Sequence, residues 1–206
     1  MTERTAQRIV MASSSPRRRE LIQSLGLRLP VVILSSEADE STPADWTPPQ
    51  IVEALALRKA RAVKEMLERS QEDDRTPAVV IGADTIVVLD GEIMGKPRDE
   101  HEAAGMLGRL QGRTHEVYTG VALVSTPGGR EAVAHGMTRV HMKPLDPARI
   151  GRYVASGEPA DKAGAYAIQG LGATLIDRIE GDYFNVVGLP LSLLSELLGE
   201  FGIDVI

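Results

Sequence analysis

The sequence predicts an α/β fold with a single mixed sheet flanked by helices. Segments with the two-residue periodicity of strands alternate with segments of helical periodicity, which is typical of a sheet covered by helices. The dipeptide Asp90-Gly91 lies between two apolar runs and predicts a primed hairpin turn, so two neighbouring strands are expected to be antiparallel. Because no internal repeat or low-complexity tract interrupts the pattern, we expect one domain over residues 1–206.

The composition excludes several classes of protein. The chain has 206 residues, 43% of them hydrophobic, which is enough for a sizeable core without stabilisation by disulfides or structural metals. It has no cysteine, and its four histidines lack the HExxH spacing, so thiolate chemistry and a histidine-rich zinc site are not expected. A net charge of -6 and only 3% aromatic residues argue against a nucleic-acid surface. With no membrane-length apolar stretch and no signal-like segment, we expect a cytoplasmic protein without membrane contact.

Strand and capping signals place the elements of the first half. Arg8–Ala12 is a β-prone run, and Ser15 and Pro16 after it are a helix cap and a first helical residue. Gly26 suits the end of that helix. The same reasoning predicts a strand at Leu29–Leu34, a helix at about Gln50–Arg69, and two strands on either side of the Asp90-Gly91 turn.

Turn and cap residues also divide the second half. A helix is expected from about Asp99 to Leu110, ended by Gly112. The remaining expected elements are strands near Thr114–Ser125 and Glu131–Met142, a helix capped by Asp146-Pro147 and running to Ser156, a Gly- and Ala-rich segment with strand character over Gly164–Val187, and a closing helix at Pro190–Phe201.

The stretch MASSSPRRREL gathers hydroxyls and positive charge where a strand turns into a helix. Unpaired backbone N–H groups and the helix dipole favour an anion at such a place. The hydroxyls of Ser13, Ser14 and Ser15 and the guanidinium groups of Arg17 and Arg18 would complete a phosphate cradle there. A capped helix with solvated arginines fits the same string, and neither GxxxxGK(S/T) nor GxGxxG occurs in the chain. The cradle therefore depends on support from elsewhere.

Lys59 interrupts an apolar stripe on the long helix. The residues of that stripe are Ile51, Val52, Leu55, Val63 and Met66. A lysine among them either extends its ammonium to solvent or meets a buried anion, of which a bound phosphate is one. The pattern leaves both outcomes open.

Three further polar residues are candidates for catalysis or ligand binding. Asp84 follows the apolar run AVVIGA, where we expect a strand interruption beside Gly82; it is either a structural turn aspartate or a carboxylate that binds metal, pairs with a cation or acts as a base. Lys96 follows the hairpin and either returns to the same end of the sheet or is a surface lysine. Gln169 lies among small residues and either reads a ligand through its amide or sits in an exposed loop.

Several motifs follow one another over about Ile9 to Leu198: SSSPRRREL, the E-x-x-E stretch Glu37–Glu40, the Lys59-Ala60 pair, GADTIV, GEIMGKP, GRTHEVYTG, DKAGAYAIQG and VVGLP. In this order they resemble the motifs of the Maf family of nucleoside triphosphate pyrophosphatases. The resemblance implies a mixed α/β fold shared with inosine-triphosphate pyrophosphatases, and hydrolysis between the α and β phosphates to a nucleoside monophosphate and pyrophosphate. It also implies a divalent cation, Mg²⁺ or Mn²⁺, with unknown ligands, and a homodimer.

Within that family the GADT variant resembles the dTTP/UTP pyrophosphatase branch, whereas the 7-methyl-GTP branch carries an Asp-Gln pair in place of Asp84-Thr85. A uracil or thymine edge offers an N–H donor beside a carbonyl, which one glutamine amide complements. A 7-methyl-GTP pyrophosphatase and a non-catalytic partner in septum formation are the alternatives. The resemblance assigns the proton acceptor to Asp84, specificity to Arg17, Thr85 and Gln169, and the acidic loop position to Glu40 rather than Glu37. From the charges themselves we expect Arg18, Lys59 and Lys96, with the turn that begins at Ser13, to hold the triphosphate.

Overall fold

The structure confirms most of the expected elements and their order. It is a computed structural model that describes residues 6–35, 37–69 and 76–206. The strands are β1 (Arg8–Ala12), β2 (Val31–Leu34), β3 (Ala78–Leu89), β4 (Glu92–Met94), β5 (Thr114–Thr126), β6 (Glu131–Met142) and β7 (Ile176–Glu180). The helices are α1 (Pro16–Ser24), α2 (Pro48–Arg69), α3 (Glu100–Leu110), α4 (Pro147–Val154), α5 (Tyr183–Val187) and α6 (Leu191–Glu200), with 3₁₀ turns η1 (Glu158–Asp161), η2 (Ala163–Ala165) and η3 (Gly170–Leu175).

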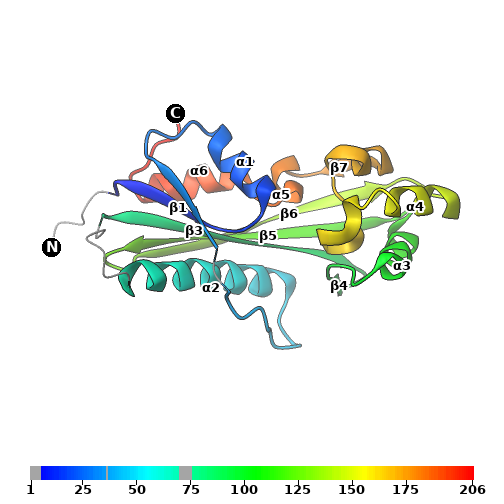
Figure 1. Cartoon of the computed structure of the whole chain (residues 1–206), viewed down its shortest axis with the longest axis horizontal. Helices are drawn as coiled ribbons and strands as arrows, with labels where there is room; N and C mark the ends of the chain where they lie inside the picture. Colours follow the sequence, from blue (N-terminus) through cyan, green and yellow to red (C-terminus); the bar gives the residue numbers. More distant parts are fainter. Residues whose placement is uncertain (1–5, 36, 70–75) are drawn as a thin grey trace. The chain divides into compact units, whose positions relative to one another are not determined.

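The strands form one mixed sheet. Its order across the described residues is β2-β1-β3-β5-β6-β7, with β4 added to β3 (Figure 1). β1 pairs in parallel with β2 and with β3, whereas β4 is antiparallel to β3 and β7 is antiparallel to β6. The predicted α/β class with a mixed sheet flanked by helices is therefore confirmed.

The predicted caps and the hairpin turn are present. The side chains of Ser15, Asp99 and Asp146 each accept a hydrogen bond from a backbone N–H in the first turn of their helix. Asp90 has φ 53° and Gly91 has φ 81°, which is the left-handed backbone that a primed two-residue turn requires. These local signals set the ends of α1, α3, α4 and the β3–β4 hairpin.

The chain divides into two compact units. The first comprises the described residues up to Asp84 together with Thr119–Gly136 and Gly188–Ile206, and the second comprises Thr85–Tyr118 and Met137–Val187. In the first unit α2 covers one face of the sheet, and α1 and α6 cover the other (Figure 1). A single domain over residues 1–206 stays a prediction. Among the described residues, no helix has both the length and the apolar character to span a bilayer.

Each unit has its own apolar core. In the first unit the core is made of small and branched side chains on β1, β3, β5 and α2: Val10, Ala12, Ala56, Ala60, Val63, Ala78, Val80, Ala122 and Val124. The second core includes Leu107 and Leu110 of α3, Val140 and Met142 of β6, and Tyr153 of α4. Aliphatic residues dominate both cores, as the low aromatic content predicts.

Three expectations are wrong. Gly164–Val187 is mostly not a strand: η2 and η3 precede β7 and α5 follows it, because Gly164 and Gly170 adopt positive φ values of 69° and 63° and break an extended chain. Met66 is 50% exposed, and Leu67 instead continues the packing of α2 on its core. Finally, no interruption occurs at Asp84, because β3 runs unbroken through it.

Candidate functional site

Two loops leave the sheet at the end where Asp84 lies. In the parallel register, Ala12 of β1 is opposite Gly82 of β3 and opposite Leu34 of β2. The loops that follow β1 and β2 therefore start at the carboxyl ends of parallel strands, which is the usual ligand-binding edge of an α/β sheet. Asp84 lies in β3 two residues beyond the last position paired with β1. Asp84 therefore lies inside a continuous strand, just past the pairing with β1, and not at the interruption that the sequence predicted.

The loop after β1 is a tight turn into α1. Ser13 is 9% exposed, its N–H donates to the carbonyl of Leu34 (2.9 Å), and its Oγ accepts from the N–H of Ser15 (3.2 Å). Ser15 in turn caps the helix, so the hydroxyls of both serines are used in holding the turn. Arg17 and Arg18 occupy the first turn of α1, whereas Arg19 is exposed.

Glycine lets α2 approach the sheet closely beside Asp84. A Cβ on Gly82 would lie 2.0 Å from the carbonyl oxygen of Ala56 and 2.8 Å from the amide nitrogen of Ala60. Because side chains two residues apart share one face of a strand, Asp84 projects to the same side of β3 as this contact. The turn of α2 that carries Lys59 is thus brought directly over Asp84.

Lys59 forms the centre of a charged cluster. Its Nζ lies 2.6 Å from Oδ1 of Asp84 and 2.7 Å from Oε1 of Glu40. The side chains of Lys59 and Asp84 are 15% and 12% exposed, whereas that of Glu40 is 66% exposed. Of the two outcomes that the sequence left open, Lys59 meets an anion, and in this structure the anion is a pair of protein carboxylates.

Arg18 lies in the same electrostatic environment. Its Nε donates a 2.7 Å hydrogen bond to the carbonyl of Gly188, in the VVGLP motif. The pKa of Arg18 is lowered, mainly by burial and further by the positive charge of Arg17. The negative charges of Asp84 and Glu40 act in the opposite direction and raise the pKa. An arginine remains charged under these conditions, so Arg18 is a fixed, half-buried cation near Asp84.

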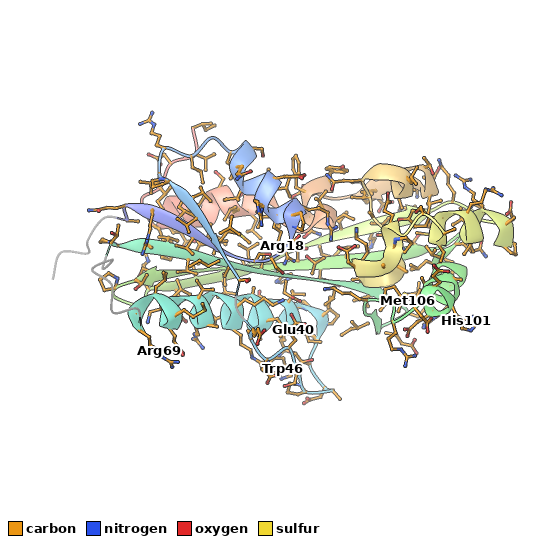
Figure 2. All side chains as sticks on the ribbon, in the orientation of Figure 1. Arg18, Glu40, Trp46, Arg69, His101 and Met106 are labelled. Atoms are coloured by element: carbon orange, nitrogen blue, oxygen red, sulfur yellow. The ribbon has the colours of Figure 1, made fainter. Side chains whose placement is uncertain are left out.

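Arg58 fixes the loop that carries Glu40. Its Nη1 donates to the carbonyl of Ser41 (2.5 Å) and to the carbonyl of Asp39 (3.2 Å), the two residues that flank Glu40. Its guanidinium also lies 5.8 Å from the ring centroid of Trp46, within cation–π range. Figure 2 shows Glu40 and Trp46 together on the loop before α2. Arg58 was not singled out from the sequence. The one feature of the sequence that could have pointed to it is its place next to Lys59.

Three of the predicted residues belong to the second unit. Thr85 follows Asp84 in β3 and is half-buried. Lys96 is exposed in the loop after β4, and Gln169 is half-buried in extended backbone at the start of η3. The structure thus brings Glu40, Lys59 and Asp84 into contact, with Arg18 near them. The approach of Thr85, Lys96 and Gln169 to that cluster stays a prediction, as do the roles of all these residues.

The carboxylates near Lys59 suit a hard divalent cation. Among the described residues, no group of three or more His, Cys, Asp or Glu side chains could hold a metal by itself. Asp84 and Glu40, however, both lie within 2.7 Å of one ammonium. Mg²⁺ is commonly bound by one or two carboxylates together with substrate phosphates and water, so the two carboxylates fit a cation that arrives with a phosphorylated ligand.

Comparison with known proteins identifies the family. The family model described as "Maf-like protein" matches residues 8–201. The chain belongs to the Maf family. It is 55% identical over 198 residues to a relative from Moorella thermoacetica named dTTP/UTP pyrophosphatase, with 96% of this chain and 97% of the relative covered.

Other relatives of this Maf-family chain carry the same name. A dTTP/UTP pyrophosphatase from Pelotomaculum thermopropionicum is 53% identical over 198 residues, which is 96% of this chain and 98% of the relative. Among solved structures, a nucleoside-triphosphatase / dITP/XTP pyrophosphatase from Mycobacterium abscessus matches 66% of this chain and 72% of its own, at 22% identity and a TM-score of 0.36.

Proposed function

We propose that this Maf-family chain hydrolyses dTTP and UTP between the α and β phosphates, releasing a nucleoside monophosphate and pyrophosphate. The observation that carries the proposal is the contact of buried Asp84 with Lys59, near Arg18, in a chain 55% identical to a protein named dTTP/UTP pyrophosphatase. The carboxylate can serve as a general base, and the cations beside it can stabilise the charge of a phosphoanhydride during hydrolysis.

The exposures of the Glu40 and Asp84 carboxylates indicate which of them a substrate displaces from Lys59. Glu40 is largely exposed and Asp84 is almost buried, so an incoming phosphate oxygen displaces Glu40 from Lys59 more easily than it displaces Asp84. Lys59 and Arg18 then hold the phosphates and stabilise the charge that develops on the leaving pyrophosphate. Asp84 accepts the proton of the water that attacks the α-phosphorus.

A divalent cation, Mg²⁺ or Mn²⁺, fits this proposal. Asp84 and Glu40 would hold it together with phosphate oxygens, and when bound it would neutralise charge on the phosphates and lower the pKa of a coordinated water. Glu40 would then leave Lys59 partly free for the substrate. Without the cation, two carboxylates next to a triphosphate repel it electrostatically.

Base selection is assigned to the residues that the family resemblance singled out. Gln169 can donate to a ring carbonyl and accept from the N3–H of uracil or thymine. Arg17 and Thr85 are proposed to complete this selection, while Ser13 and Lys96 contribute to phosphate binding. We further propose a cytoplasmic nucleotide pool as the source of substrate and a homodimer as the working form.

A nucleotide panel tests the reaction and its base preference together. The chain is incubated with dTTP, UTP, CTP, ATP and 7-methyl-GTP in Mg²⁺ or Mn²⁺, and released pyrophosphate is measured against orthophosphate. We expect pyrophosphate from dTTP and UTP above all. Orthophosphate as the first product would overturn the proposed reaction. Preferential hydrolysis of 7-methyl-GTP would overturn the assignment of the base. No hydrolysis of any nucleotide would favour the alternative of a non-catalytic partner in septum formation.

A matched pair of aspartate variants tests the proposed base. Asp84→Asn keeps the size of the side chain and removes its basicity, so turnover of UTP should fall about 10²–10⁴-fold. Asp90→Asn is the control, because Asp90 is an exposed aspartate that pairs with Arg113 at the hairpin. Wild-type turnover in folded Asp84→Asn would show that Asp84 is not the base.

A further inference from the structure

A phenol and a carboxylate hold the loop that carries Gln169. The hydroxyl of Tyr153 donates to Oε1 of Glu158 (2.9 Å) and accepts from the N–H of Ala167 (3.1 Å). Glu158 also accepts from two backbone groups, the N–H of Leu171 at Oε2 (2.9 Å) and the N–H of Gly172 at Oε1 (2.8 Å). The hydrogen bonds therefore bracket Gln169, two residues before it and two and three residues after it.

Close packing leaves the loop little room around these two side chains. A Cβ on Gly170 would lie 2.5 Å from Oε2 of Glu158, and one on Gly172 would lie 2.6 Å from the hydroxyl of Tyr153. Tyr153 is only 5% exposed, so its hydroxyl is held from within the core of the second unit. The loop backbone thus wraps directly around the phenol and the carboxylate.

The carboxylate is held in its charged form. Burial alone would raise the pKa of Glu158, but the hydrogen bonds from the N–H groups of Gly172 and Leu171 and from Tyr153, with the charge of Lys162, outweigh it and lower the pKa. Hydrogen bonds to an ionised acceptor are stronger than neutral ones. The hydrogen bonds from the loop backbone to Glu158 are therefore strong near neutral pH.

We propose that Tyr153 and Glu158 are positioning residues that fix Gln169 for recognition of the pyrimidine base. The inference rests on the proposed function, because it gives Gln169 a base to read. A hydrogen-bonding group discriminates between ligands only when it is held within a fraction of an ångström of its working geometry. Loss of the Tyr153 hydrogen bond frees the backbone before Gln169, and loss of the Glu158 hydrogen bonds frees the backbone after it. In either case the amide of Gln169 is no longer held in one position.

The kinetic test uses Tyr153→Phe, which keeps the ring and removes only the hydroxyl. UTP is compared with N3-methyl-UTP, which lacks the N–H that a glutamine amide accepts. We expect the ratio of the two kcat/KM values to fall about tenfold, through a higher KM for UTP and a nearly unchanged kcat. Tyr183→Phe is the matched control, since Tyr183 is a 40% exposed tyrosine of the same unit. An unchanged ratio in Tyr153→Phe would overturn the proposal.

A double-mutant cycle separates positioning from a general loss of structure. If Tyr153 acts through Gln169, Tyr153→Phe should leave the UTP to N3-methyl-UTP ratio unchanged in a Gln169→Ala background. An equal, additive loss in both backgrounds would show that Tyr153 does not act through Gln169. Glu158→Gln should reproduce the effect of Tyr153→Phe, because an amide has one acceptor oxygen and cannot accept from the N–H groups of both Leu171 and Gly172 as the two carboxylate oxygens do.

Hydrogen exchange distinguishes failure of this inference from failure of the proposed function. The amides of Leu171 and Gly172 should exchange about tenfold faster in Glu158→Gln than in the wild type, and those of other elements should not. Unchanged exchange would overturn the positioning role even if UTP is hydrolysed. If the wild type hydrolyses no pyrimidine nucleotide, the proposed function and the assigned target of Gln169 fail together, while faster exchange would still show that Glu158 holds the loop.

Discussion

The ammonium of Lys59 lies 2.6 Å from Oδ1 of Asp84, and both side chains are nearly buried. Removal of one member of such a pair leaves the other as a poorly compensated buried charge. We therefore expect Lys59→Met to lower the free energy of unfolding by about 3 kcal/mol. Urea unfolding followed by circular dichroism measures the change.

The double variant Lys59→Met/Asp84→Leu is the control for this prediction. Because it removes both charges and fills the space with apolar groups, it should regain most of the stability lost in Lys59→Met. Glu40, whose side chain is 66% exposed, can keep its carboxylate in water. A double variant as unstable as the sum of its single variants would show that the two charges are not coupled.

His115 should make stability depend on pH. It is 2% exposed, its Nε2 shares a 2.6 Å hydrogen bond with the hydroxyl of Tyr166, and burial, with the nearby His141, lowers its pKa to about 4. Between about pH 6.5 and 4 the unfolded chain binds a proton that the folded chain does not, so stability falls as pH falls through this window and levels off below it. The full effect is about 3 kcal/mol.

The measurement compares variants across that window. The free energy of unfolding is determined from pH 7 to pH 4 for the wild type, His115→Gln and His101→Gln. His101 is an exposed histidine on α3, so its variant should follow the wild-type curve. The curve of His115→Gln should have a smaller slope between pH 6.5 and 4. Parallel curves for wild type and His115→Gln would contradict the prediction.

Much of the fold is predictable from the sequence because local signals mark the ends of its elements. Ser15, Asp99 and Asp146 cap helices through bonds that span only three residues, and Asp90-Gly91 forms its turn without help from the rest of the chain. The segment Gly164–Val187 is different. Its turns depend on Glu158 and Tyr153, which bind its backbone from outside the segment, so composition alone suggested a strand.

The candidate site was predictable as a set of residue types but not as a set of contacts. Lys59 and Asp84 stand out because each is a charge in an apolar pattern. That they meet depends on Gly82, which lets α2 approach β3, and a sequence pattern does not show what a glycine packs against. Likewise nothing in the sequence shows that Arg18 donates to Gly188, 170 residues away.

Gly82→Ala should therefore disrupt the site without touching a charged residue. The added methyl group would lie 2.0 Å from the carbonyl oxygen of Ala56, so α2 must shift away from β3 and carry Lys59 with it. We expect a loss of about 1–3 kcal/mol in stability and a lower kcat for UTP. Gly105→Ala is the control, because Gly105 is exposed in α3 with open space around it, and alanine there should stabilise the helix by about 0.5–1 kcal/mol. Unchanged stability and activity in Gly82→Ala would contradict the contact.

Arg58 should hold the Glu40 loop, and the fluorescence of Trp46 provides a direct readout. Trp46 is the sole tryptophan of the chain, and the guanidinium of Arg58 lies 5.8 Å from its ring centroid. Arg58→Ala removes this contact and both hydrogen bonds to the backbone around Glu40. We expect Trp46 emission to shift to the red and iodide to quench it more strongly, because the indole becomes more exposed to water.

Two comparisons decide whether the effect belongs to the loop. Arg61→Ala removes a different arginine of α2, an exposed one that pairs with Glu131, and should leave Trp46 emission unchanged. Arg58→Lys keeps the charge, but its ammonium ends one bond short of the Nη1 position that donates to both carbonyls, so it should behave more like Arg58→Ala than like the wild type. If Arg58→Lys is indistinguishable from the wild type, charge alone holds the loop and the two backbone hydrogen bonds do not. If Arg58→Ala leaves Trp46 emission and quenching unchanged, Arg58 does not anchor the loop.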